Sequence, residues 1–393
     1  MDASPGFQQT TVAVVGGGAV LRLGEALDRL GVSDPGILID PGLVEGVVAD
    51  AVRSSAPHGL LIPADAGEPT FASVSSAAER VRDSECDGLI AVGGGSTIDT
   101  AKLLRGLLAT GADDLAGVPD DAELQALPLI AIPTTAGTGA EMGSSAVVID
   151  PRRDHKVLLT IPGLAPDVAI DDGHLTTTLP PSLTAYTGCD ALAQAVLAYS
   201  TAGHDAIGGQ LALRAIELIL EWLPRAVADG NDLRAREEMM LGSASSAIAM
   251  FNAPVRWDLE HAIAEPLGSM LGIHHGHLVA AFLPGVAEFN IPALEDRYAE
   301  LARHLGLAQP KDDDHAGALA MVTRLRVFVR EVGVPALGLV AGDRDFDPLV
   351  EQILNAGQVK TNPVPMPADA IQAIIAGAWD GTFSCSLATA APR

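Results

Sequence analysis

The sequence predicts an α/β N-terminal domain with a doubly wound parallel sheet, followed by an all-α C-terminal domain. In the first half, short β-branched runs alternate with helical patterns, as in parallel sheets that carry helices on both faces. After Leu179, long stretches at helical spacing follow one another without strand patterns. The pair Pro180–Pro181 interrupts the chain between these halves, so we expect domains at 1–180 and 181–393.

The expected elements of the first half are short apolar strands with amphipathic helices between them. The strands are expected at 11–15, 37–39, 59–62, 89–92 and 129–132, and the helices near 21–30, 43–53, 71–83 and 97–108. Continuous apolar strands predict burial on both faces of the sheet. In the second half, helical spacing occurs at 191–200, 206–223, 234–250, 316–331 and 367–379.

Composition narrows the class of protein. The chain has 393 residues, of which 48% are hydrophobic, enough to bury the cores of two domains. A net charge of −26 argues against nucleic acid or an anionic membrane as a partner. No apolar run approaches the roughly 20 residues of a membrane span, and the first residues lack a signal-peptide pattern, so we expect a cytoplasmic protein. Three widely spaced cysteines argue against a disulfide framework or a thiolate metal site.

Two glycine-containing loops follow neighbouring strands of the predicted sheet. Gly93–Gly95 lie between a buried strand and a helix, where backbone N–H groups and the helix dipole attract a pyrophosphate. A plain strand-to-helix turn is the alternative. The loop at 133–145 is rich in glycine and hydroxyl residues, which also suits a merely flexible loop. Because the carboxyl ends of parallel strands meet at one edge of a sheet, we expect both loops to hold one ligand there.

An aspartate ends the predicted strand at 37–39. The carboxylate of Asp40 can accept hydrogen bonds from an adenosine ribose, and it would repel the additional phosphate of NADP. This favours NAD as the cofactor. The alternative is that Asp40 only begins the turn Asp-Pro-Gly.

Acidic and imidazole side chains in the second half suggest a metal site. Asp190 and Gln194 are one helical turn apart on the same predicted helix face, and His261 and His275 follow downstream. One carboxylate and two imidazoles from separate elements can bind Zn²⁺ or Fe²⁺ and leave positions open for substrate. The alternative is that these histidines are ordinary core or surface groups.

Taken together, these motifs resemble the iron-containing, group III alcohol dehydrogenases over nearly the whole chain. The resemblance rests on GGGSTIDTAK at 93–102, PTTAGTGAE at 133–141, TGCDAL at 187–192, the segments around His261 and His275, and TNP at 361–363. It implies a dehydroquinate-synthase-like fold, an NAD(P) cofactor between the domains, and divalent iron or zinc in the helical domain. It also implies a small alcohol or carbonyl substrate and a homodimer or higher homo-oligomer.

The resemblance assigns roles by position. Expected cofactor contacts are Asp40, Gly94, Gly95, Ser96, Asp99, Thr134, Thr135, Thr138 and Lys156. Expected metal ligands are Asp190, His261 and His275, with Gln194 where the family usually has a fourth, histidine ligand. A neutral amide oxygen is a poorer donor, so metal affinity should fall. Glu265 replaces another usual histidine, one that relays the substrate proton, so we expect Glu265, His261 and His275 to be catalytic.

The function expected from these residues is NAD-dependent alcohol dehydrogenase or aldehyde/ketone reductase activity, with NADP less favoured. If Gln194 leaves the site without metal, the chain is instead similar to maleylacetate reductases. His261, His275 and Glu265 would then polarise the carbonyl, and Arg256 would bind a carboxylate. A non-catalytic nucleotide-binding relative is a further alternative. Dehydroquinate synthase itself is disfavoured, because the second half has few lysines for a phosphorylated substrate.

Overall fold

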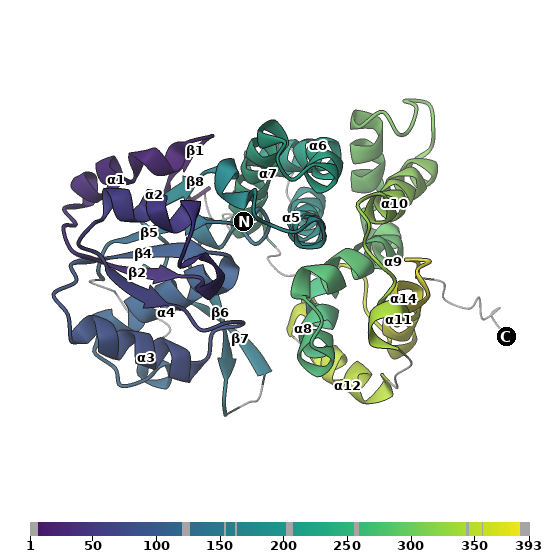
Figure 1. The fold of residues 1–393 in the computed structure, drawn as a ribbon. Coiled ribbons are helices and arrows are strands. Elements are labelled where there is room, and N and C mark those ends of the chain that lie inside the picture. Colours follow the sequence, from purple (N-terminus) through teal and green to yellow (C-terminus); the bar gives the residue numbers. More distant parts are fainter. Residues whose placement is uncertain are drawn as a thin grey trace. The chain divides into compact units, whose positions relative to one another are not determined.

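The protein forms two compact units in the computed structural model. The structure describes residues 7–119, 126–152, 155–161, 163–201, 207–254, 259–342, 346–355 and 357–385. One unit comprises Met1–Leu179 with Gly230–Ile248, and the other comprises Pro180–Asp229 with Ala249–Arg393. The first unit contains the strands and the second is helical (Figure 1), which confirms the predicted fold class.

A six-stranded parallel sheet forms the centre of the first unit, in the order β1-β8-β5-β4-β2-β3. Its strands are β1 (Val12–Val15), β2 (Pro35–Ile39), β3 (Leu60–Pro63), β4 (Gly88–Gly93), β5 (Leu129–Pro133) and β8 (Val168–Asp171). The five predicted strands are therefore confirmed. Gly93 pairs with Pro133 in register, so β4 and β5 end at the same edge of the sheet.

Helices cover both faces of this sheet because alternate strand residues point to opposite sides. Leu38 and Ala91 belong to one buried cluster, whereas their neighbours Ile39 and Val92 belong to another. The helices of these clusters are α1 (Leu23–Leu30), α2 (Val47–Ser55), α3 (Phe71–Arg82) and α4 (Gly95–Thr110). The sequence predicted α2 to begin near residue 43, but Pro41–Leu43 form a short 3₁₀ turn that Asp40 caps.

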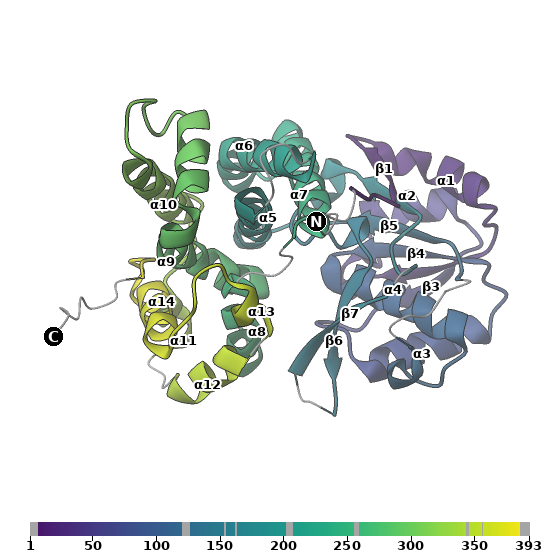
Figure 2. The ribbon, with the colours of Figure 1, turned by 180° about the vertical axis from the view of Figure 1, so that it is seen from behind.

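Three strands of the first unit were not predicted from the sequence. One is β8, a run of only four residues that ends in aspartate. The others form the antiparallel hairpin of β6 (Ser145–Asp150) and β7 (His155–Thr160), which lies beside α4 (Figure 2). The glycine-rich loop before β6 was the stronger local pattern, and it concealed the alternating burial of this short strand.

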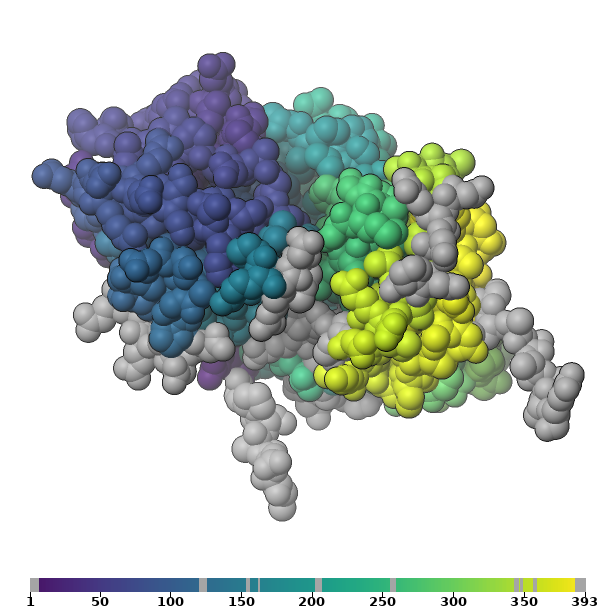
Figure 3. Space-filling model, turned by 90° about the horizontal axis from the view of Figure 1, so that it is seen from below, coloured from purple at the N-terminus to yellow at the C-terminus, as the bar shows by residue number. Residues whose placement is uncertain are grey.

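Four helices of the second unit pack on its long helix α9 (His275–His304), and the remaining helices pack on those four. Besides α9, the helices are α5 (Pro181–Thr201), α6 (Ile207–Ala228), α8 (Leu259–Leu271), α10 (Asp314–Glu331), α11 (Leu337–Ala341), α12 (Asp347–Asn355), α13 (Gly357–Thr361) and α14 (Ala368–Asp380). By length and composition α9 could cross a membrane, but 83% of its most apolar window is buried within the protein, as in a core helix. The last described residues of the chain, coloured yellow, gather on the face that Figure 3 shows.

One helical segment groups with the first unit, whereas the sequence analysis placed it in the helical domain. This segment, Gly230–Ile248, contains most of α7 (Leu233–Phe251). A Cβ on Gly173 would lie 2.6 Å from the Glu237 backbone nitrogen, and the buried Arg236 guanidinium donates to the carbonyl of Leu179 at 3.4 Å. Such close packing between distant segments has no local sequence signature. The boundary at residue 180 otherwise stays a prediction.

Candidate functional site

The two predicted ligand loops touch at the carboxyl edge of the sheet. A Cβ on Gly95 would lie 2.8 Å from Thr138 Oγ1, and one on Gly94 would lie 3.4 Å from Thr135 Cγ2. The Thr134 amide donates to the Gly93 carbonyl at 3.0 Å, which joins the loops where their strands end. The expectation that both loops lie at one edge is therefore confirmed, and a Cβ on Gly95 would force the Thr138 side chain to shift.

The start of α4 can receive an anion. Gly94 is its N-cap and offers no side chain to the amides of Gly95 and Ser96, which begin the helix before its own hydrogen bonds start. Gly94, Gly95 and Ser96 are all partly exposed, so a phosphate can reach these amides. The helix is 16 residues long, and its dipole adds positive potential at this end. This partly exposed helix start therefore fits a pyrophosphate.

Asp40 lies beside the glycine-rich loop. Its amide donates to the Val92 carbonyl at 2.9 Å, and a Cβ on Gly93 would lie 3.1 Å from the Asp40 Cβ. Asp40 Oδ1 accepts from the Gly42 amide at 2.8 Å, which is the turn that the sequence offered as an alternative. The side chain remains partly exposed, so the turn and a ribose contact are compatible.

Asp99 and Lys156 are tied to other protein groups. Asp99 is 9% exposed; its Oδ1 lies 3.3 Å from Lys102 Nζ, and its Oδ2 accepts from the Val147 amide at 2.9 Å. The fully buried Lys102 also donates to the Ser145 carbonyl at 2.7 Å. This network fixes α4 to the β6 strand. On β7, Lys156 Nζ donates to Glu68 Oε1 at 2.7 Å.

Two buried acids, Glu141 in the second loop and Asp171 at the end of β8, were not singled out from the sequence. Burial raises the pKa of Glu141 to about 7. Burial, and then the neighbouring Glu141 charge, raise the pKa of Asp171 well above its usual value. Both residues are at most 2% exposed, so their ionised forms are costly in the folded state.

We expect Glu141→Gln to stabilise the protein above pH 7 by roughly 2–3 kcal/mol. A carboxyl whose pKa is raised by folding contributes stability below its unfolded pKa of about 4.5, and loses that contribution as pH rises to about 7. The gain should therefore shrink towards pH 4.5. The gain is measured by urea unfolding at a pH above 7 and at pH 4.5. The proteins compared are the wild type, Glu141→Gln and the exposed control Glu85→Gln. An equal gain at both pH values would contradict the assignment.

In the second unit, three predicted ligands come together from three helices. Asp190 on α5, His261 on α8 and His275 at the start of α9 each offer one ligand atom, and these atoms all lie within 4.8 Å of one another. His261 Nε2 lies 3.3 Å from Asp190 Oδ1, and the two imidazole rings are 5.1 Å apart. Asp190 and His261 are buried and His275 is half-buried. This donor set fits a divalent first-row metal ion.

Gln194 lies on α5 one helical turn after Asp190 and is 4% exposed. Glu265 lies one turn after His261 on α8 and is partly exposed. The i,i+4 spacing places each of these side chains on the same helix face as a ligand. Arg256, the predicted carboxylate-binding residue, lies outside the described residues.

A close helix contact positions His275. A Cβ on Gly276 would lie 2.6 Å from the Tyr186 carbonyl oxygen, one turn before Asp190 on α5. The Tyr186 ring stacks on His277 at 4.7 Å, and His277 Nε2 donates to the Pro335 carbonyl at 2.9 Å. His277 is therefore engaged in holding the start of α9 against α5.

We expect Gly276→Ala to weaken metal binding by about 10–100-fold, because the added methyl forces α5 and α9 apart and with them Asp190 and His275. Metal content and competition with a chelator measure the change. Gly285→Ala is the control on the same helix, because its Cβ would meet nothing closer than 3.5 Å. Unchanged metal affinity in Gly276→Ala would show that this contact does not set the ligand geometry.

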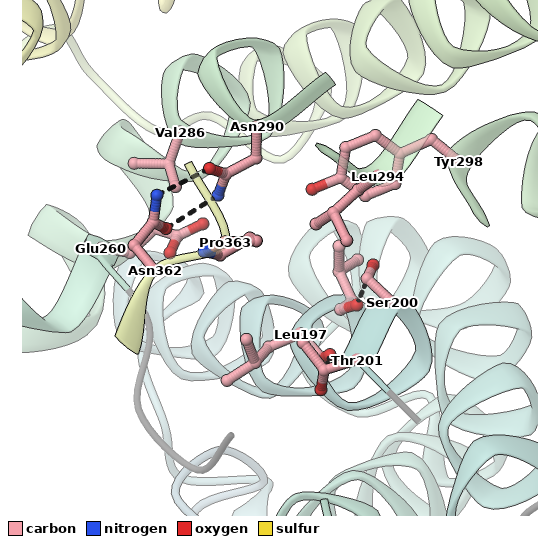
Figure 4. Close-up of a pocket in the computed structure, with 11 residues that line it drawn as sticks. Leu197, Ser200, Thr201, Glu260, Val286, Asn290, Leu294, Tyr298, Asn362 and Pro363 are labelled. Atoms are coloured by element: carbon pink, nitrogen blue, oxygen red, sulfur yellow. Dashed lines mark hydrogen bonds between the residues drawn. The ribbon is translucent and has the colours of Figure 1, made fainter. Parts of the chain in front are cut away.

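A pocket that the sequence analysis missed lies among the helices that carry the ligands (Figure 4). It is lined by Val196, Leu197, Ser200, Thr201, Glu260, Val286, Asn290, Leu294, Tyr298, Asn362 and Pro363. Asn290 and Asn362 exchange two amide hydrogen bonds of 3.0 and 2.8 Å, which fasten the TNP segment to α9. Glu260 directly precedes His261, so the pocket shares a wall with the metal-ligand helix.

Comparison with known proteins identifies the family of this chain. Residues 10–173 match the iron-containing alcohol dehydrogenase family, and residues 184–379 match the C-terminal domain of the Fe-containing alcohol dehydrogenase family. The probable alcohol dehydrogenase EutG of Salmonella typhimurium is 38% identical over 83% of this chain and 82% of its own length. The chain belongs to the iron-containing alcohol dehydrogenase family. It is accordingly an oxidoreductase that acts on CH–OH groups.

Other members of the iron-containing alcohol dehydrogenases show the same relationship. The NAD-dependent methanol dehydrogenase of Bacillus methanolicus is 33% identical over 82% of this chain and 86% of its own length. A solved 1,3-propanediol oxidoreductase superposes with a TM-score of 0.88 at 28% identity, covering 95% of this chain and 100% of its own. Sulfoacetaldehyde reductase from Bifidobacterium kashiwanohense, solved with NAD⁺, has a TM-score of 0.83 at 27% identity and covers 95% of this chain and 98% of its own.

Proposed function

We propose that this family member is an NAD-dependent, metal-assisted alcohol dehydrogenase, or aldehyde or ketone reductase, for a small substrate. The observation that carries the proposal is the convergence of Asp190, His261 and His275 within 4.8 Å. These residues, with Gln194, would hold a divalent metal, Fe²⁺ or Zn²⁺. When bound, the metal supplies Lewis-acid polarisation of the substrate oxygen.

The residues of the first unit would hold NAD. The amides of Gly94, Gly95 and Ser96 would bind the pyrophosphate, and Asp40 would accept from the adenosine ribose. Thr134, Thr135, Thr138 and Lys156 are the further proposed contacts. Asp99 would act indirectly, because its carboxylate already binds Lys102 and the Val147 amide and so keeps α4 beside the hairpin. Bound NAD supplies the nicotinamide that accepts or donates a hydride.

Glu265, one turn after His261, is the proposed proton carrier for the substrate oxygen. His261 and His275 would be held in place by the metal and, in a metal-free enzyme, would polarise the carbonyl by hydrogen bonding. Glu265→Gln is expected to lower kcat while leaving metal content unchanged, because glutamine cannot exchange the proton.

The test is NADH oxidation by purified protein with a panel of aldehydes, ketones and keto acids, before and after chelation. We expect chelation to remove most activity and Fe²⁺ or Zn²⁺ to restore it. Full activity in protein without bound metal would remove the metal from the proposal. A higher kcat/KM with NADPH than with NADH would contradict the role of Asp40. No binding of either dinucleotide at millimolar concentration would remove the function itself.

A metal-independent, maleylacetate-reductase-like enzyme is the second candidate. The observation that favours it is Gln194, which lies one turn after Asp190 on α5 and offers an amide oxygen, a poorer donor to a metal than an imidazole. Turnover of maleylacetate by chelated protein would support this candidate. We also propose a cytoplasmic location. We further propose a homodimer or higher homo-oligomer, and size-exclusion chromatography with light scattering would test this oligomeric state. Family membership disfavours the non-catalytic alternative.

A further inference from the structure

Gln194 has an unusual environment for a glutamine. It is 4% exposed, and its Oε1 is fully buried without a hydrogen-bond partner among the residues that the structure describes. A buried carbonyl oxygen without a partner costs about 1–3 kcal/mol. This cost argues that the oxygen has a use that the protein chain alone does not supply.

The position of Gln194 indicates what that use is. It follows Asp190 by four residues on α5, and side chains at this spacing lie on one helix face. Asp190 is one of the three residues whose ligand atoms lie within 4.8 Å of one another. A cation bound among those atoms would supply the missing partner, because the Gln194 oxygen carries a partial negative charge and can coordinate the cation.

With Gln194, the donors become two oxygens and two imidazole nitrogens. Imidazole favours Zn²⁺, whereas carboxylate and carbonyl oxygens favour harder ions such as Mn²⁺. An amide oxygen in place of a nitrogen lowers affinity for Zn²⁺ more than for Mn²⁺, because the Mn²⁺ ion depends less on nitrogen donors. Fe²⁺ lies between the two in affinity order.

We propose that Gln194 sets the metal selectivity of this site, reducing its preference for Zn²⁺ over harder divalent ions. The inference rests on the proposed function in requiring a metal at Asp190, His261 and His275. It goes further, because it assigns the choice of ion to one side chain. Gln194→His is therefore expected to raise the preference for Zn²⁺ over Mn²⁺ at least about tenfold.

The experiment measures metal binding, and it does not depend on turnover. Mn²⁺ is titrated into chelated full-length protein, free Mn²⁺ is followed by electron paramagnetic resonance, and Zn²⁺ is added as competitor. The ratio of the two dissociation constants is compared among the wild type, Gln194→His, Gln194→Glu and Gln372→His. Gln372 is an exposed glutamine on α14 of the same unit, so it controls for an added imidazole elsewhere.

A tenfold rise in the Zn²⁺ preference of Gln194→His, with Gln372→His like the wild type, supports the proposal. Gln194→Glu keeps an oxygen donor, so its preference should stay within about threefold of wild type even if both affinities rise. An unchanged ratio in folded Gln194→His overturns the role of Gln194 and leaves the metal site intact. Binding of neither ion to any variant overturns the proposed metal site as well. If Gln194→His does not fold, a Gln194→Glu preference shifted towards Zn²⁺ by tenfold overturns the proposal.

Discussion

Asp190→Asn is expected to lower kcat/KM by at least about 10³-fold, equivalent to roughly 4 kcal/mol of transition-state stabilisation. The substitution keeps the size of the side chain and removes the only carboxylate among the three convergent ligands. Without that charge we expect the proposed site to lose its metal, and the substrate oxygen to lose the polarisation that the metal would supply. Steady-state kinetics and metal analysis of the same preparations measure both effects.

The matched control for Asp190→Asn is Asp369→Asn, an exposed aspartate on α14 of the same unit. It should keep wild-type kinetics and metal content. Circular dichroism checks that Asp190→Asn is folded, which the conserved size of the side chain favours. If Asp190→Asn lost activity but kept its full metal content, the carboxylate would have a role other than ligation.

Gly95→Val is expected to weaken NADH binding by about 10–100-fold, or roughly 1.4–2.8 kcal/mol. Any Cβ at this position would lie 2.8 Å from Thr138 Oγ1 and 3.0 Å from Thr138 Cγ2. A branched side chain would therefore separate the two loops and cover the first-turn amides of α4, the proposed pyrophosphate contacts. Fluorescence titration with NADH measures the dissociation constant.

Gly24→Val is the control for Gly95→Val, because Gly24 lies in a helix of the same unit and its Cβ would meet nothing within 4 Å. The control should bind NADH like the wild type. Wild-type affinity in folded Gly95→Val would show that the dinucleotide does not use this helix start. Metal content should stay unchanged in both variants, because the ligands lie in the other unit.

Local patterns in the sequence predicted much of the fold. Apolar runs of three or four residues identified β2, β4 and β5, and the glycine run at the end of β4 identified the loop before α4. These predictions succeeded because burial on both faces and helix N-termini impose residue choices within a few positions of one another. The short β8 and the hairpin of β6 and β7 lacked such a pattern.

What the sequence by itself determined was the chemistry available: a glycine-lined helix start, and a carboxylate, an amide and two imidazoles in the second half. Only the tertiary structure decided which of them meet. Asp190, His261 and His275 come from three helices, and Gly276 against Tyr186 lets two of these helices approach. Packing also places the Asp99 carboxylate where it accepts from the Val147 amide, and it groups Gly230–Ile248 with the first unit. Long-range packing depends on the fit of distant side chains, which periodicity along the chain does not record.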